Sequence, residues 1–452
     1  MQKKNFAEFL QKIILEPDNP GREFILHGQT YGDIYKTALS IRSLLLNISS
    51  DEFVCLCSES KDFILSAIIA SIGGAPSIVI PHSFNKRVIK EIKNTIGFNT
   101  ILTDIPEKIF PGIPVVTPDK LKQTNDNFLT IRDADSIFLK IFTGGSTGKP
   151  KMWQKTPRNI LAEVNYHAKS FNITKDDIFV STVPPQHIYG LLHSVLIPYV
   201  SSARVIEQVC IFPQEIISAV NNNNTTVLVS IPIHYRVLKG SAFKLSSLKL
   251  ALSSAGNLDF PDAEHFFNQT GCAVTEIFGS TETGGIATRQ NSGKETAWKP
   301  LDVIEWKIEN DRLRVCSEFI SPDLPKDSNG FFITEDRVEK KENNKFIHLG
   351  RADGVIKVAG KRVDLKEIET ALKKIPGVDD VVVVSITSSG GRKNIVAALV
   401  EGKIDQSIVK ESAIQMLEPY AVPRIIRIVE KIPVLPTGKY DRVKIQSLIK
   451  SS

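Results

Sequence analysis

Cysteine is scarce in this sequence, and its spacing excludes several kinds of site. The five cysteines, an odd number, include no C-x-x-C pair; they are Cys55, Cys57, Cys210, Cys272 and Cys316. Such a set fits neither a disulfide framework nor a zinc site, and it is typical of a chain that works in a reducing compartment. We therefore expect a cytoplasmic protein.

Long hydrophobic runs are also missing. The longest uncharged stretch, residues 63–84, is broken by Gly73, Gly74, Pro76 and Pro81, which favours a buried helix followed by a strand over a membrane span. Charged residues interrupt residues 1–15, so this segment is expected to be a surface helix rather than a signal peptide. The sequence predicts no membrane span.

The chain has little excess charge of either sign. Its 452 residues include 56 Lys+Arg and 50 Asp+Glu, a net charge of +6. Residues 353–452 contain 17 Lys+Arg and 12 Asp+Glu, so 17 − 12 = +5 of that charge lies there. This distribution excludes a dedicated nucleic-acid binder and suits a partner that carries phosphate groups. The length predicts at least two domains.

From about residue 50 to residue 290, short apolar runs alternate with helical patterns. The runs are apolar on both faces, as are strands of parallel sheets covered by helices. Their alternation with helices predicts the α/β class. The expected strands are Phe53–Cys57, Ser77–Ile80, Thr100–Thr103, Ile137–Phe142, Ile178–Val183, Ala203–Ile206, Val227–Ile231, Leu248–Ser253 and Ala273–Phe278.

The rest of the chain has two other patterns. Residues 298–349 combine short strands with turns, which predicts a small antiparallel or barrel-like unit; the Asn221–Asn224 run before them is expected to be a loop. The tail predicts a compact α+β unit of helices and strands: Asp364–Ile375, Asp380–Ile386, Asn394–Val400, Ile404–Leu417 and Arg424–Val429. We predict an N-terminal domain of residues 1–350 and a mobile C-terminal domain of residues 351–452, with a hinge at Gly350–Gly354.

A glycine-rich segment follows the expected strand Ile137–Phe142. Glycines let the backbone turn sharply and bring N–H groups close to an anion, and hydroxyl and ammonium groups add further donors. The segment is not a Walker A loop, because Thr143 stands where that pattern needs Gly. The alternative is a strand-to-loop connection without a ligand. The candidate phosphate-binding residues are Thr143, Gly144, Gly145, Ser146, Thr147, Gly148, Lys149 and Lys151.

Thr143–Lys151 resembles the phosphate loop of the adenylate-forming (AMP-binding) superfamily, which includes acyl-CoA synthetases, carrier-loading adenylation domains and luciferases. Four further motifs follow in that superfamily's order, so the resemblance spans roughly residues 50–445. It implies that Thr147 is a catalytic donor in the loop. It also implies a large N-terminal domain of parallel-sheet subdomains and a small mobile C-terminal domain.

The motif Glu276–Glu282 resembles the superfamily's aromatic-Gly-x-Thr-Glu sequence. The resemblance implies that the ring of Phe278, next to Gly279, stacks on adenine. It also implies that Thr281 binds a phosphate oxygen and that Glu282 holds Mg²⁺, a hard cation that prefers oxygen ligands.

Two segments resemble other walls of the superfamily's pocket. Ser253–Asn257 is similar to the loop beside the adenine, which implies a binding role for Ala255 and Gly256. His187 stands on the expected wall of the acyl pocket; the alternative is a buried structural histidine. The segment Ile188–Gly190 offers no carboxylate to pair an α-ammonium group, which favours an acid without one. The Pro-Pro-Gln-His stretch before it, residues 184–187, resembles acid ligases of aryl-polyene-type pathways, which implies an aromatic or short acyl substrate.

Three further segments of the resemblance lie in the second half of the chain. Asp336, after Glu335 where Gly is usual, is implied to bind the ribose hydroxyls. In the long match Gly350–Glu369, Arg351 is implied to bind ribose or phosphate, Asp353 to be the hinge, and Gly360 to line the path of the thiol arm. Pro433–Lys439 resembles the closing motif with the catalytic lysine, Lys439, although Leu435 replaces the usual Thr.

The resemblance implies an ATP-dependent ligase that joins a carboxylic acid to a thiol. The acid would react with ATP to give an acyl-AMP or aryl-AMP and pyrophosphate, and a thiol would then displace AMP. The implied cofactors are ATP, Mg²⁺ and coenzyme A, or the phosphopantetheine of an acyl carrier protein in place of coenzyme A. A catalytically degenerate nucleotide-binding paralogue is the alternative of another class. The sequence leaves open which acid is used, which thiol accepts it, and whether the protein is a monomer or a dimer.

Overall fold

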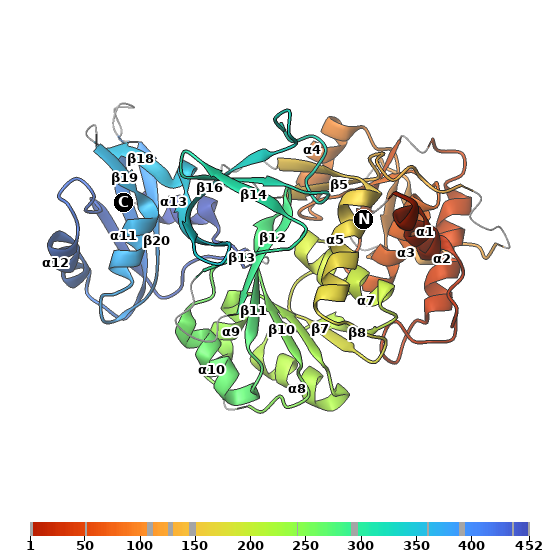
Figure 1. Ribbon diagram of the computed structural model, residues 1–452, viewed down its shortest axis with the longest axis horizontal. Coiled ribbons are helices and arrows are strands. Elements are labelled where there is room, and N and C mark those ends of the chain that lie inside the picture. Colours follow the sequence, from red (N-terminus) through yellow and green to blue (C-terminus); the bar gives the residue numbers. More distant parts are fainter. Residues whose placement is uncertain are drawn as a thin grey trace. The chain divides into compact units, whose positions relative to one another are not determined.

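The structure is a computed structural model that describes residues 3–49, 52–105, 112–124, 130–143, 151–241, 243–290, 297–358, 361–387, 394–435 and 438–450. Its chain forms two compact units (Figure 1). The large unit contains the described residues up to Glu305 together with Cys316–Asp327. The small unit contains Trp306–Val315 and the described residues from Ser328 onward.

The first sheet of the large unit has six strands in the order β4-β3-β1-β2-β5-β6. Its pairs are parallel except for β5 with β6. The strands and their helices are β1 (Phe53–Cys57), α3 (Lys61–Ile72), β2 (Ser77–Ile80), α4 (Lys86–Ile96), β3 (Ile101–Thr103), β4 (Val115–Val116), η1 (Pro118–Lys120), β5 (Leu139–Thr143) and β6 (Lys151–Lys155). All four residues of β2 are buried, as expected of an inner parallel strand.

The second sheet has seven strands in the order β13-β12-β11-β10-β9-β7-β8. The strands β8, β7, β9, β10 and β11 run parallel, while β12 and β13 are antiparallel. Their bounds are β7 (Ile178–Ser181), β8 (Arg204–Val209), β9 (Val227–Ser230), β10 (Leu250–Ser253), β11 (Val274–Ser280), β12 (Gly284–Gln290) and β13 (Lys299–Pro300). The carboxyl ends of the five parallel strands therefore lie at one edge of this sheet.

Helices cover both faces of the second sheet. One face packs on α8 (Pro213–Asn223), α9 (Pro232–Leu238) and α10 (Phe260–Thr270), which lie together beside β7–β11 in Figure 1. Contacts also join a second group of helices to each other and to the two sheets. This group is α1 (Lys3–Ile14), α2 (Tyr31–Leu44), α3, α5 (Pro157–Ser170), α6 (Ile188–Gly190), η2 (Leu191–Leu196) and α7 (Ile197–Val200).

The small unit contains three sheets of its own. An antiparallel sheet has the order β14-β15-β16-β17, from Glu305–Glu309, Arg312–Cys316, Phe332–Lys341 and Lys345–Arg351. After η3 (Ala352–Gly354), β18 (Val355–Val358) pairs with β19 (Lys361–Asp364). The last sheet, β20-β21-β22, comprises Val378–Thr387, Asn394–Gly402 and Ile425–Val429, packed against α11 (Leu365–Leu372), α12 (Gln406–Met416) and α13 (Arg442–Lys450).

The predicted α/β class, the parallel sheets and the antiparallel pattern of residues 298–349 are confirmed. The loop expected at Asn221–Asn224 is wrong in part. The helix α8 continues to Asn223, and Asn224 ends it in the left-handed conformation that asparagine tolerates at a helix terminus. Within the described residues, each helix is too short or too polar to cross a membrane.

Candidate active site

The candidate residues of the large unit follow the carboxyl ends of parallel strands. His187 follows β7, Ala255 and Gly256 follow β10, and the turn with Glu282 follows β11. These three strands belong to one parallel array, so the three segments share one edge of the second sheet. In open α/β sheets this edge is where ligands bind.

The arms of the glycine-rich loop form an antiparallel pair. Thr143, the last residue of β5, lies opposite Lys151, the first residue of β6. The indole N–H of Trp153 donates to the Thr143 hydroxyl at 3.2 Å, and Lys151 is exposed. The two ends of the glycine-rich loop therefore lie next to each other. The candidates Gly144, Gly145, Ser146, Thr147, Gly148 and Lys149 lie outside the described residues.

The Thr-Glu motif lies in a tight turn between β11 and β12. A Cβ added at Gly279 would collide with the carbonyl oxygen of Gly284, so the close approach of the two strands requires glycine there. The hydroxyls of Ser280 and Thr283 lie 2.9 Å apart, and each accepts a hydrogen bond from the other residue's N–H at 3.2 Å. The turn is thus held by its own side chains.

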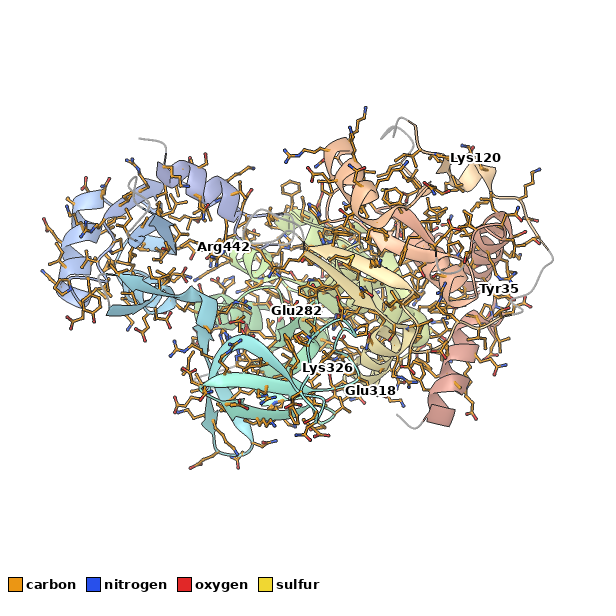
Figure 2. All side chains as sticks on the ribbon, turned by 90° about the horizontal axis from the view of Figure 1, so that it is seen from above. Tyr35, Lys120, Glu282, Glu318, Lys326 and Arg442 are labelled. Carbon is orange, nitrogen blue, oxygen red and sulfur yellow. The ribbon has the colours of Figure 1, made fainter. Side chains whose placement is uncertain are left out.

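This turn presents a hydroxyl and a carboxylate side by side. Thr281 is buried and Glu282 is half-buried. The N–H of Ser321 donates to the Glu282 carbonyl oxygen at 2.8 Å, and Glu282 is labelled in Figure 2. The ring of Phe278 is half-buried and packs on Trp298 with 5.3 Å between centroids.

The loop after β10 is tied to β11 from both ends. Ala255 has a φ of 69°, an unusual conformation for a residue with a Cβ, and the Ser254 hydroxyl donates to the Ile277 carbonyl at 2.9 Å. The buried carboxylate of Glu276 accepts from the N–H of Leu258 at 3.0 Å and pairs with Arg289. Glu276 therefore positions this loop.

The sequence analysis missed a buried charged pair behind the Thr-Glu turn. Glu163 of α5 accepts a hydrogen bond from the Gly285 N–H at 2.7 Å, and burial raises the pKa of its carboxyl to about 7. Burial also lowers the pKa of Lys155, at the end of β6, to about 8, although the negative charges of Glu163 and Glu282 act to raise it. The one signal that could have found Glu163 is its position inside the apolar run 160–164, whereas Lys155 stands among other basic and polar residues.

His187 lies at the start of α6 and is half-buried. The turn before it is compact: a Cβ at Gly190 would collide with the Pro184 carbonyl oxygen. Two other histidines were missed, His193 and His167, whose rings lie 5.2 Å apart. Both are fully buried, and burial lowers the pKa of His193 to about 4 and that of His167 well below its usual value.

In the small unit, Asp336 and Arg351 lie opposite each other on β16 and β17. The Asp336 carboxylate is 3.0 Å from Nε2 of His348, a residue that the sequence analysis missed. Glu335, which replaces the superfamily's glycine, pairs with Arg312 at 2.7 Å. The substitution therefore adds an ion pair beside the candidate ribose ligand.

Lys439 is an exposed residue of a short hairpin near the end of the small unit. Gly360 and the side chain of Asp353 lie outside the described part of the structure. Each unit thus gathers its own share of the candidates: the large unit holds His187, the Ala255 loop and the Thr-Glu turn, and the small unit holds Asp336, Arg351 and Lys439.

Two mainly parallel sheets packed with helices, followed by a β-rich and an α+β unit, carry these motifs at their strand ends, and this combination is that of the adenylate-forming enzymes. Residues 18–319 match the AMP-binding enzyme family, and residues 367–439 match the C-terminal domain of the same enzymes. The chain belongs to the AMP-binding enzyme family.

Its relatives are distant. It is 26% identical over 367 residues to a mitochondrial malonate–CoA ligase of Homo sapiens, covering 67% of this chain and 64% of that protein. It is 22% identical over 357 residues to a 3-hydroxybenzoate/4-hydroxybenzoate–CoA ligase of Thauera aromatica, covering 70% and 67%. The chain thus spans slightly under two thirds of that malonate–CoA ligase. The crystal structure of ATP-bound MatB from Rhodopseudomonas palustris has a TM-score of 0.84 at 19% identity, covering 98% and 99% of the two chains.

Proposed function

We propose that this protein activates a carboxylic acid with ATP, forms an acyl-AMP or aryl-AMP with release of pyrophosphate, and transfers the acyl group to the thiol of coenzyme A. The observation that carries the proposal is the shared sheet edge. It brings a turn with Thr281 and Glu282 next to the loop with Ala255 and Gly256. Family membership and the named CoA ligases among the relatives support the same reaction class.

The first step needs stabilisation of charge on phosphate oxygens. The acid's oxygen attacks the α-phosphorus of ATP, and the bond from that phosphorus to the bridging oxygen of pyrophosphate breaks. Fixed hydrogen-bond donors and cations lower the barrier of such a step. We assign this role to the Thr281 hydroxyl, Lys151 and the glycine-rich loop, and to the Lys439 ammonium.

Glu282 is the proposed ligand of Mg²⁺. Among the described residues no group of three or more His, Cys, Asp or Glu side chains could hold a metal by itself. A single half-buried carboxylate fits Mg²⁺ nevertheless, because this ion commonly binds one or two carboxylates together with substrate phosphates and waters. When bound, Mg²⁺ would neutralise charge on the phosphate oxygens.

Asp336 and Arg351 are proposed to bind the ribose and its phosphate. Their places on adjacent strands suit a joint role, because a carboxylate accepts from sugar hydroxyls and a guanidinium donates to phosphate. We further propose that the C-terminal domain turns near Asp353 between the two half-reactions, so that Lys439 serves the first and Gly360 the second.

The test is an acid-dependent assay of pyrophosphate release with ATP and Mg²⁺. The panel contains malonate, 3-hydroxybenzoate, 4-hydroxybenzoate, medium-chain fatty acids and the proteinogenic amino acids, each with and without coenzyme A. We expect release with a simple carboxylic acid and a thioester only when coenzyme A is present. Amino acids should support negligible release, since Ile188–Gly190 offers no carboxylate for an ammonium group.

Two outcomes would change the proposal. If the adenylate forms but coenzyme A accepts nothing, a purified phosphopantetheinyl carrier protein replaces it as the thiol, which is the second candidate function. If no acid releases pyrophosphate while calorimetry shows that ATP binds, the protein is a nucleotide-binding paralogue without ligase activity.

A further inference from the structure

Lys439 lies in a hairpin whose backbone bonds are few and local. This Lys439 hairpin comprises residues 432–435 and 438–441. The N–H of Leu435 donates to the Lys439 carbonyl at 2.7 Å, and the N–H of Asp441 donates to the Pro433 carbonyl at 2.9 Å. Val434 and Tyr440 form a single antiparallel bridge. Such a short ladder is weak by itself in water.

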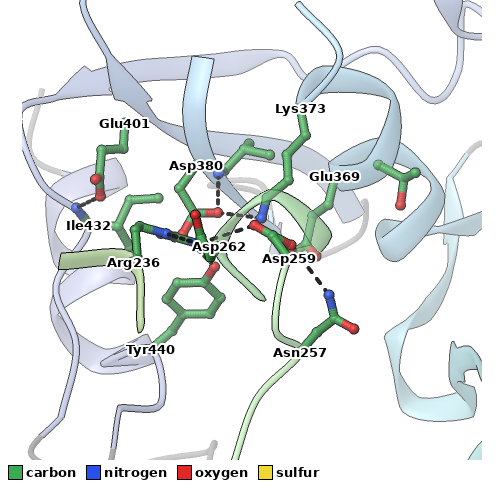
Figure 3. A network of polar contacts seen from close by, with 12 residues as sticks. Arg236, Asn257, Asp259, Asp262, Glu369, Lys373, Asp380, Glu401, Ile432 and Tyr440 are labelled. Atoms are coloured by element: carbon green, nitrogen blue, oxygen red, sulfur yellow. Dashed lines mark hydrogen bonds and ion pairs between the residues drawn. The ribbon is translucent and has the colours of Figure 1, made fainter. Parts of the chain in front are cut away.

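A side-chain bond ties this hairpin to the sheet of the small unit. The hydroxyl of Tyr440 donates to Oδ2 of Asp380 on β20 at 2.8 Å, a contact marked in Figure 3. The Tyr440 ring packs against the apolar cluster that includes Val382 and Ile445. Tyr440 thus anchors the hairpin to the sheet at the position directly after the exposed Lys439.

Asp380 is a buried, fully hydrogen-bonded acceptor for the Tyr440 hydroxyl. Its side chain is 4% exposed, and a buried carboxylate is costly unless it is paired and hydrogen-bonded. Its other oxygen, Oδ1, accepts from the ammonium of Lys373 and from the N–H of Val381, each at 2.8 Å. Both carboxylate oxygens are thus engaged, and a hydrogen bond to an ionised acceptor is stronger than a neutral one.

We propose that Tyr440, through Asp380 and Lys373, is a positioning residue that holds the Lys439 hairpin in the arrangement needed for the adenylation step. The inference rests on the proposed function, because the hairpin matters for adenylation only if Lys439 has the role proposed for it. The physical tie itself can be measured without any substrate.

The first experiment is amide hydrogen exchange of the full chain, read by mass spectrometry on peptides that cover the hairpin. Tyr440→Phe keeps the ring and removes only the hydroxyl. We expect exchange of the Leu435 and Asp441 amides to become about tenfold faster, and exchange of β20 and β21 to stay unchanged. Tenfold corresponds to the loss of one hydrogen bond to a charged group. Unchanged exchange in the hairpin would overturn the proposal.

Two further variants sharpen this measurement. Asp380→Asn should loosen the hairpin in the same way, and Lys373→Met should do so to a smaller extent, because Tyr440 keeps its acceptor. Tyr31→Phe is the matched control: its hydroxyl donates to the carbonyls of Pro198 and Ala203 in the large unit. If Tyr31→Phe speeds hairpin exchange as much as Tyr440→Phe does, the effect is not local and the proposal fails.

The second experiment separates this inference from the proposed function. With an acid accepted in the screen, Tyr440→Phe should lower the adenylation rate about tenfold, leave KM for ATP near its original value, and barely change thioester formation from synthetic acyl-AMP. Lys439→Ala is measured beside it. If Lys439→Ala has no effect on adenylation, the role proposed for the lysine fails. If it has a large effect and Tyr440→Phe has none, only the positioning inference fails.

Discussion

The two turns that carry the candidate acid and the candidate lysine are anchored in different ways. The Glu282 turn joins two long sheet strands, its glycines allow backbone contact, and a buried acid, Glu163, bonds the strand that follows. The Lys439 hairpin has a single backbone bridge, and side chains tie it to the sheet at two places, Glu401 to the Ile432 N–H and Asp380 to the Tyr440 hydroxyl. The Glu282 turn is thus part of a sheet, whereas the Lys439 hairpin is attached to one, which suits the proposal that Lys439 serves only one of the two half-reactions.

Removing the lysine tests the weaker anchor most directly and should have the largest effect. Lys439→Ala is expected to lower the adenylation rate by roughly 10²-fold, as loss of one charge-stabilising donor commonly does. Thioester formation from synthetic acyl-AMP should fall far less, since the role proposed for the lysine is confined to adenylation. The measurement is the pair of half-reactions on purified protein. Equal slowing of both steps would show that Lys439 is not specific to adenylation.

A methyl group at Gly279 tests the stronger anchor. Gly279→Ala forces a Cβ against the Gly284 carbonyl and should cost about 2 kcal/mol of stability, a typical overpacking penalty. Adenylation should fall with it, because the Thr-Glu turn must shift. Gly240→Ala is the matched control, since a Cβ there meets only the Val237 carbonyl at an ordinary 3.7 Å. Equal melting temperatures of the two variants would contradict the close-packing argument.

The buried histidines behind the large unit's site predict an acid-sensitive fold. The pKa of His193 is about 4 when folded, below its ordinary value of 6.5, because burial disfavours the charged ring. The unfolded chain therefore binds the proton first, so stability present above pH 6.5 is lost as the pH falls toward 4. In His193→Gln, this loss between pH 7 and 4.5 should shrink by about 2 kcal/mol.

The check is denaturant unfolding of both proteins across that pH range. His234→Gln should act in the same direction, because burial lowers the pKa of His234 to about 4 as well. If the free energy of unfolding of wild type and of His193→Gln falls equally with pH, His193 does not cause the acid sensitivity.

The smallest effect is expected at the open end of the glycine-rich loop. Lys151 is exposed at the start of β6, so solvent screens its charge and Lys151→Ala should slow adenylation only several-fold. Unlike Tyr440→Phe, it should leave exchange of the Lys439 hairpin unchanged. A loss as large as that of Lys439→Ala would mean that the loop lysine, not the hairpin lysine, supplies the main charge.

Local pattern was enough for much of the large unit. The strands Phe53–Cys57 and Ser77–Ile80 were predicted at the residues where they occur, because runs that are apolar on both faces fit only an inner parallel strand. The strand β12 was missed, since Gly284-Gly285 reads as a turn. Its pairing with β11 depends on glycines opposite each other across the two strands, which no single segment reveals.

The chemical character of the candidate site was also readable in order along the chain: glycines, hydroxyls and Lys151 in one segment, Thr281 and Glu282 in another, Lys439 near the end. The residues that hold these candidates in place could not be predicted from the sequence. Glu163 is the one acidic residue of α5, where a carboxylate would usually face water, and Tyr440 follows Lys439 with no sign of its partner sixty residues earlier, Asp380.

The sequence by itself determined the fold class and the enzyme family, and it supplied the candidate groups for ATP binding, because periodicity and short motifs are properties of neighbouring residues. Only the tertiary structure decided which charges are buried and what each one holds. Burial and hydrogen bonding depend on chain segments far apart in the sequence, and the free energy of a charge is set by those surroundings.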